Sequence, residues 1–214
     1  MHWQGSIGKQ LLCAMFACAC PAQHWEIGAG GGYGIYHNAS IYAPAGKAAA
    51  GFRNRFVLTA VFGEDLYRRI SGEVRYTYQD GDPFIEAGSI RANVQGQSHA
   101  FHYDLLLHAR RKEEKLRPYL ALGIGAKLYR VTGPANPNQA LGAIGRLASQ
   151  EEIKPLITAG AGIRFRPSRN LVIRLDFRDY ITPFPKNVIQ PAPFGTARGI
   201  FHQFTPVVGV GMLF

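Results

Sequence analysis

Residues 199–214 have the sequence G-I-F-H-Q-F-T-P-V-V-G-V-G-M-L-F. Every second residue of this stretch from Phe204 to Phe214 is apolar, and the residues between them are mostly small or polar. Because successive side chains of a β-strand point to opposite faces, this alternation predicts a strand with one large apolar face. The stretch ends on the aromatic residue Phe214, which we expect to lie at a lipid boundary if the strand closes a membrane barrel.

A last strand of alternating apolar residues that ends in Phe resembles the closing strand of bacterial outer-membrane β-barrels. In that family this ending resembles the signal that the barrel-assembly machinery recognises. The resemblance therefore implies that this machinery is a partner of the chain. It also implies that the assembly signal is formed by Phe204, Val208, Val210, Met212 and Phe214.

The same alternation predicts seven strands upstream, at 23–36, 53–63, 70–78, 98–110, 117–131, 153–166 and 171–180. The clearest is 70–78, where Ser71, Glu73, Arg75 and Thr77 alternate with residues assigned to the outward face. This arrangement, polar inside and apolar outside, is the inverse of a soluble barrel and is typical of a transmembrane one.

The predicted connections alternate between long and short. Long loops are expected at 38–51, 79–97, 132–152 and 181–198, and short turns at 63–68, 111–115 and 167–170. Short periplasmic turns and longer outer loops are typical of membrane barrels. We therefore predict an all-β fold, an eight-stranded antiparallel up-and-down transmembrane β-barrel over residues 23–214, whose first and last strands pair. It resembles the OmpA-type transmembrane family, without a peptidoglycan-binding domain after Phe214, so cell-wall tethering is not expected.

Residues 1–22 have the features of a secretory signal peptide. Lys9 is followed by a short apolar run at 11–19, and Cys20, Pro21 and Ala22 precede an expected cut near Ala22. A lipid anchor at Cys18 or Cys20 is an alternative. All three cysteines of the chain lie in this segment, so we expect no disulfide in the exported chain, which we assign to the outer membrane.

The formal net charge is +10, but the basic residues are scattered along alternating strands. We therefore expect no nucleic-acid partner, and we expect outer-membrane lipids and lipopolysaccharide to supply the counter-charges. No metal or cofactor site is expected, and the chain is expected to be a monomer.

The inward faces of the predicted strands carry charges of both signs. Because buried charges need partners, we expect an ion-pair network in the lumen. Its candidates are Glu26, Glu73, Arg75, Asp104, Arg117, Lys127, Lys154, Arg164, Arg174, Asp176 and Arg178. The network either fills the barrel or lines a narrow solute pathway that favours anions.

Aromatic residues near the strand ends are expected to form interfacial girdles. The candidates are Trp25, Tyr33, Tyr76, Tyr78, Tyr103, Tyr180 and His202. His102 and Asp104 share a face with Ser98, which leaves a lipid A-modifying enzyme as a low-ranking alternative. The expected function is that of an integral outer-membrane barrel with a structural or surface-interaction role and no catalytic chemistry, and a narrow porin-like channel is the first alternative.

Overall fold

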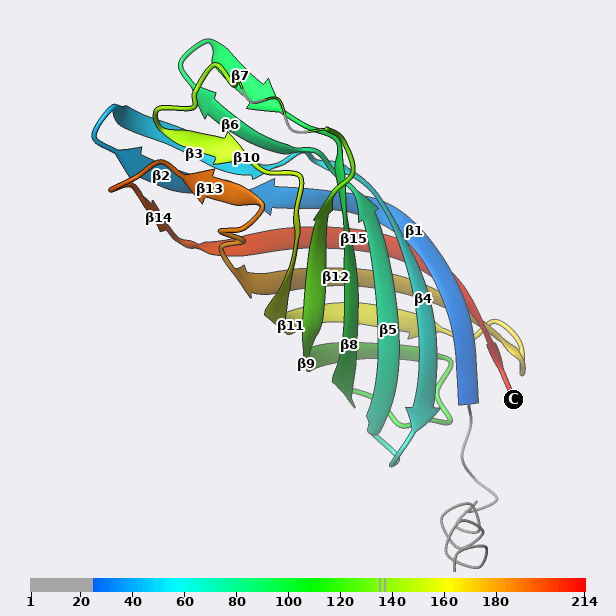
Figure 1. Cartoon of the computed structure of the whole chain (residues 1–214). Helices are drawn as coiled ribbons and strands as arrows, with labels where there is room; N and C mark the ends of the chain where they lie inside the picture. Colours follow the sequence, from blue (N-terminus) through cyan, green and yellow to red (C-terminus); the bar gives the residue numbers. More distant parts are fainter. Residues whose placement is uncertain (1–24, 135, 137) are drawn as a thin grey trace, which may run out of the picture.

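The computed structural model describes residues 25–134, 136 and 138–214, and their regular structure consists of β-strands. The predicted signal peptide at 1–22 lies outside the described residues. Eight long strands form one closed antiparallel barrel in the order β1-β15-β12-β11-β9-β8-β5-β4 (Figure 1). Their bounds are β1 Trp25–His37, β4 Arg55–Asp65, β5 Ile70–Asp80, β8 Gly96–His108, β9 Leu116–Val131, β11 Glu151–Phe165, β12 Leu171–Pro183 and β15 Ile200–Leu213.

The predicted fold class is confirmed. The first and last barrel strands pair in an antiparallel register that places Ala29 opposite Val210, and β15 pairs with β12 on its other side. Closure leaves none of the eight barrel strands with an unpaired edge. No helix among the described residues is long and apolar enough to cross a membrane.

The outer wall of the barrel is apolar. Leu122, Ile124 and Val208 are 64%, 71% and 59% exposed, which soluble proteins avoid over a continuous surface. Further exposed residues of this wall come from most barrel strands: Ile27, Leu58, Phe62, Phe101, Leu105, Leu107, Leu120, Ile157, Leu175, Phe177, Val210 and Met212. The wall therefore matches the lipid-facing surface of a transmembrane barrel.

The long connections are not the irregular loops that the sequence predicted. They contain seven short strands, β2 Ala39–Ala43, β3 Gly46–Phe52, β6 Pro83–Ala87, β7 Ile90–Asn93, β10 Gly145–Leu147, β13 Ile189–Pro191 and β14 Thr196–Arg198. Five of them form a sheet in the order β14-β2-β3-β6-β7, and β10 pairs with β13. The Ala-, Gly- and Pro-rich composition concealed these strands, because several of their pairings join segments far apart in the chain.

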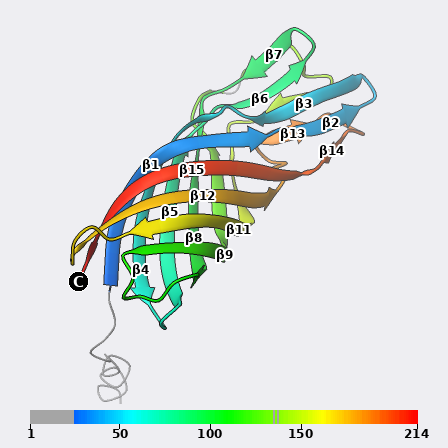
Figure 2. The same ribbon diagram turned by 180° about the vertical axis from the view of Figure 1, so that it is seen from behind.

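This second group of strands lies beyond one end of the barrel, and the carboxyl terminus lies at the other end (Figures 1 and 2). We call these the sheet end and the turn end. By the usual asymmetry of membrane barrels, we expect the turn end to face the periplasm and the sheet end to face outward.

The sheet end has its own apolar core, which closes the barrel mouth. Phe52 stacks on Tyr129 with ring centroids 4.9 Å apart, and Phe201 stacks on Phe184 at 5.2 Å. Tyr36 packs against Phe52 at 5.3 Å. The same core includes Ile41, Ala48, Ala50, Ile85, Leu141, Ile144, Leu147, Val188 and Ile189.

We predict that Leu122→Lys lowers the free energy of unfolding in a lipid bilayer by about 2–4 kcal/mol, because it places a charge on the lipid-facing wall. Ile90→Lys is the matched control, since Ile90 is 49% exposed but lies on β7 at the sheet end. It should change stability by no more than about 0.5 kcal/mol. Urea unfolding in vesicles measures both, and equal effects would contradict the assignment of the outer wall to lipid.

Candidate functional site

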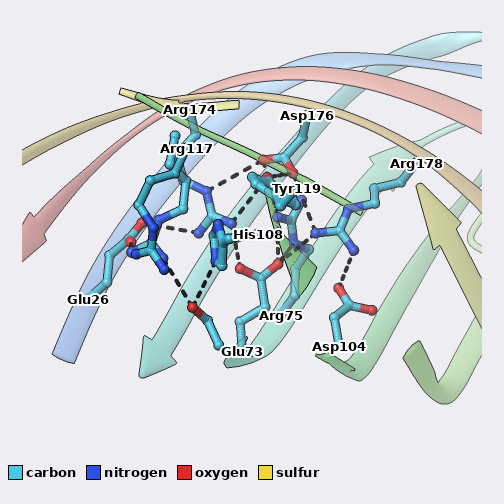
Figure 3. A network of polar contacts seen from close by, with 12 residues as sticks. Glu26, Glu73, Arg75, Asp104, His108, Arg117, Tyr119, Arg174, Asp176 and Arg178 are labelled. Atoms are coloured by element: carbon cyan, nitrogen blue, oxygen red, sulfur yellow. Dashed lines mark hydrogen bonds and ion pairs between the residues drawn. The ribbon is translucent and has the colours of Figure 1, made fainter. Parts of the chain in front are cut away.

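The barrel interior contains a network of buried charges (Figure 3). At its centre, Glu73 is 2% exposed and binds three guanidinium groups. Its Oε1 accepts from Arg75 Nη2 at 2.8 Å and from Arg178 Nη2 at 2.9 Å, and its Oε2 accepts from Arg174 Nη2 at 2.5 Å. A carboxylate shared in this way fixes long side chains from β5 and β12 to one another across the lumen.

Two further carboxylates extend the network along the barrel axis. Asp176 lies 3.2 Å from Arg75 Nη2 and accepts a hydrogen bond from the Tyr119 hydroxyl. Asp104 Oδ2 accepts from Arg178 Nη1 at 2.7 Å, while its Oδ1 accepts from Thr158 at 2.5 Å.

Near the turn end, three arginines lie side by side on adjacent strands. The register places Arg164 opposite Arg117 on one side and opposite Arg174 on the other. Like charges in such positions repel, so the row needs carboxylates from elsewhere. Glu26 supplies one, since it binds Arg164 and also accepts from Arg174 Nη1 at 3.1 Å.

The other carboxylate is Asp65, which is absent from the candidates predicted from the sequence. It accepts from Arg117 Nη1 at 3.0 Å, from Arg164 Nη1 at 3.3 Å and from the Ser71 hydroxyl at 2.6 Å. The sequence pattern did indicate this residue, because the alternation along the strand places Asp65 on the same face as the inward residues. It was missed because 63–68 was assigned to a turn, whereas β4 continues to Asp65.

Ser71 also lies 2.8 Å from His108 Nε2. The group of serine, histidine and aspartate nevertheless lacks the geometry of a catalytic triad, because Asp65 binds the serine and not the second histidine nitrogen. Ser71 and His108 are also 2% and 1% exposed, so a substrate outside the barrel cannot reach them.

Lys127 lies in the lumen as expected, but its contacts are not those of an ion pair. Its ammonium donates to the Tyr36 hydroxyl at 2.8 Å and to Gln203 Oε1. It also lies 4.8 Å and 4.9 Å from the ring centroids of Tyr36 and Tyr129. A cation–π cage therefore holds this ammonium directly below the aromatic core of the sheet end.

Tyr180 is not a girdle residue. It has the same parity on β12 as Arg178, so its ring points into the lumen, where it is 2% exposed. Its hydroxyl lies 2.9 Å from Thr77 Oγ1 and 3.4 Å from His102 Nε2. The expectation failed because a tyrosine near a strand end suits either face, and only the alternation decides between them.

His102 is part of this interior arrangement. Its Nδ1 lies 3.0 Å from Asp104 Oδ1. Ser98, the serine considered beside them, is instead 3.4 Å from the Tyr36 hydroxyl. His102 and Asp104 are 1% and 0% exposed and serve the network's hydrogen bonding.

The remaining aromatic candidates lie on the outward face. Trp25 stacks on Phe62 at the turn end with ring centroids 5.1 Å apart, and Tyr33 donates to the Asn54 carbonyl near the sheet end. Tyr76, Tyr78 and Tyr103 also point outward, and His202 stacks on Phe204 and contacts Asp179. Of the expected assembly signal, Phe204, Val208, Val210 and Met212 lie on the outward face of β15 and Phe214 directly follows this strand; their role in assembly stays a prediction. Lys154 pairs with Glu152 at 2.6 Å and not with the lumen network.

Glycines on the inward face leave the room that the network occupies. A Cβ at Gly123 would lie 1.8 Å from Asp104 Oδ1 and 2.5 Å from Thr158 Oγ1. At Gly160 it would lie 2.6 Å from the Arg178 Cδ. Larger residues at these positions would displace the charged groups from the narrow lumen.

The outer surface of the sheet end carries a second candidate site. Phe194 is 96% exposed and has φ 62°, a conformation that a non-glycine residue adopts at a cost. Beside it, a hollow of about 470 Å³ is lined by Lys186, Pro191, Gly195, Thr196, Ala197 and Arg198. An exposed ring beside two cations can stack on a partner and pair with its anionic groups.

We predict that Glu73→Gln lowers the free energy of unfolding by about 3–5 kcal/mol, because it leaves buried guanidiniums without their shared carboxylate. Glu113→Gln in the turn between β8 and β9 is the matched control, and it should have an effect within about 0.5 kcal/mol. Equilibrium urea unfolding in detergent micelles measures both. An equally small effect of the two substitutions would show that the network does not stabilise the barrel.

Solved structures with a similar fold come from several bacteria. OprG from Pseudomonas aeruginosa matches with a TM-score of 0.57 at 12% identity, over 90% of this chain and 96% of that one. A major outer membrane protein from Thermus thermophilus matches with a TM-score of 0.53 at 9% identity, over 90% and 100%. Neisserial surface protein A matches with a TM-score of 0.50 at 13% identity, over 90% and 97%.

No protein-family model matches the chain, and the comparison with curated protein sequences found no match. At these identities the structural matches establish the fold and not an activity. Together with the charged interior and the apolar outer wall, they show that the chain has the fold of the small, eight-stranded outer-membrane β-barrels.

Proposed function

We propose that this protein is a closed, non-conducting barrel of the outer membrane whose function is surface interaction through its sheet end. The observation that carries the proposal is the filled interior. Glu73, Asp176 and Asp104 are each bound by arginines from other parts of the wall, and all three are 7% exposed or less.

The interior argues against a solute pathway at two levels. In the barrel, an ion passing the Glu73 cluster would have to separate charge pairs that lie 2.5–3.2 Å apart. Above it, Phe52 stacks on Tyr129 and meets Phe201 edge to face, and these rings occupy the mouth. A conducting pore would lack both of these obstacles, so the narrow channel is the weaker candidate function.

A catalytic role also finds little support. Lipid-modifying chemistry needs a nucleophile or a base that reaches a lipid at the rim. The two histidines of the lumen, His102 and His108, are 1% exposed and bonded inside it, so neither reaches a lipid.

The sheet end supports an interaction role because it is a folded platform and not a set of loops. Its five-stranded sheet and the β10–β13 pair share one apolar core, which fixes the position of the surface above them. Phe194, Lys186 and Arg198 then favour a partner that carries negative charge beside a flat face. Lipopolysaccharide and other anionic glycans have this chemistry, and they join the lipid bilayer and the assembly machinery as the proposed partners.

We expect no reproducible conductance from the purified protein in planar bilayers. Arg75→Ala should also remain silent, because Arg174 and Arg178 still occupy the same cross-section. Steady single-channel currents in the unmodified protein, altered in size or selectivity by Arg75→Ala, would replace this proposal with the solute pathway.

We expect the protein in nanodiscs to bind dextran sulfate and not neutral dextran. The triple variant Phe194→Ser, Lys186→Gln, Arg198→Gln should bind it at least about tenfold more weakly, since each charge-assisted contact contributes about 1.5–3 kcal/mol. Arg91→Gln with Arg130→Gln is the control, because it removes two exposed charges of the sheet end outside the hollow. Equal losses in the two variants, measured by biolayer interferometry, would rule out the Phe194 surface as the site.

A further inference from the structure

The turn end of the barrel contains a small cavity with an unusual lining. It is formed by Asp65, Glu114, Lys115, Arg117, Arg164, Arg166, Val172 and Leu213. Its volume of about 10 Å³ is enough for one water-sized group. Four of its lining residues are cations and two are anions.

Arg117 is the residue that points to a ligand. It is 5% exposed, and its Nη1 binds both oxygens of Asp65, at 3.0 Å and 3.2 Å. Its Nε and Nη2 are buried and have no hydrogen-bond partner among the described residues. A guanidinium with two unsatisfied buried donors is destabilising by itself, and an acceptor in the cavity would satisfy it.

The two carboxylates of the lining do not supply that acceptor, since Glu114 makes no hydrogen bond to Nε or Nη2 of Arg117. Asp65 is already shared by Arg117, Arg164 and Ser71. Arg164 also forms an ion pair with Glu26. The positive charge in the cavity therefore exceeds the negative charge that its neighbours provide.

The Arg166 side chain and the backbone of Lys115 are held in place by hydrogen bonds at the opening. The Arg166 amide donates to the Lys115 carbonyl at 2.8 Å, and the Arg166 Nη2 donates to the Glu113 carbonyl at 3.0 Å. The turn between β8 and β9 is thereby tied to the turn between β11 and β12. Such pre-organisation lowers the cost of ligand binding.

The cavity opens at the level where the apolar wall ends. Leu116 and Phe165 form the register pair next to Arg117 and Arg164, and they are 39% and 41% exposed on the outer face. The surrounding turns are basic, with Arg68, Arg69, Arg110, Arg111, Lys112, Lys115, Arg166 and Arg169 against Glu64, Glu113 and Glu114. This edge of the wall is where lipid headgroups lie.

We propose that the turn-end mouth is a binding site for a phosphate group. One anionic oxygen enters the cavity and accepts from Arg117 Nε and Nη2, and the rest of the group lies between Lys115 and Arg166. Guanidinium forks bind phosphate oxygens in this way. Free phosphate and the phosphate of a phospholipid headgroup share this chemistry.

The first test measures the temperature at which half of the detergent-purified protein loses its folded gel mobility. We expect inorganic phosphate to raise this temperature by about 3 °C or more relative to chloride at equal ionic strength. Lys115→Gln with Arg166→Gln should abolish the difference. So should Arg117→Lys, which retains the charge but lacks the forked donors.

The control is Arg110→Gln with Arg111→Gln, which removes two charges from the same rim outside the cavity and should keep the phosphate effect. Loss of the effect in the control as well, or no difference between phosphate and chloride in the unmodified protein, would overturn the proposal. Repeating the measurement in phosphatidylglycerol nanodiscs shows whether the bound phosphate group comes from a lipid headgroup or from the free anion. Added phosphate has no further effect if the headgroup occupies the site, and it still stabilises the barrel if the free anion does.

Discussion

The closed ladder of backbone hydrogen bonds is the constraint on which the rest of this structure depends. In hydrocarbon, an unpaired N–H or C=O group costs several kcal/mol, so a sheet can cross a membrane only when it has no edge. Here β1 pairs with β4 on one side and with β15 on the other. Closure divides every barrel strand into one series of side chains that meets lipid and one that meets the lumen.

The narrowness of an eight-stranded barrel then determines what the lumen can contain. Its charged side chains fit because glycines remove bulk from the wall: Gly123 leaves room for Asp104, and Gly160 leaves room for Arg178. Once inside, the guanidiniums need carboxylates, and sharing of Glu73 among three of them joins the strands into a single ionic unit. The result is a packed polar core where a wider barrel would hold water.

The two ends of the barrel are closed by different chemistry. At the sheet end, aromatic rings stack over the mouth, and the Lys127 ammonium lies beneath them in a cage of tyrosines. At the turn end, the closure is ionic and carries more positive than negative charge, with donors of Arg117 left unsatisfied. The apolar end can support a platform for contacts outside the membrane, whereas the cationic end is suited to anions at the inner surface.

The sequence alone determined the barrel strands and their faces, because an alternation with period two is a local property that needs no knowledge of partners. It correctly placed Glu73, Arg75 and Arg174 inside and Val208 outside. Only the tertiary structure decided that Glu73 meets Arg178, 105 residues away, and that Lys127 meets tyrosines and not a carboxylate. The short strands of the sheet end, such as β2 and β14, also emerged only there. Contacts across a lumen and pairings between distant segments depend on the register and tilt of strands that the chain brings together from afar, and no local pattern encodes them.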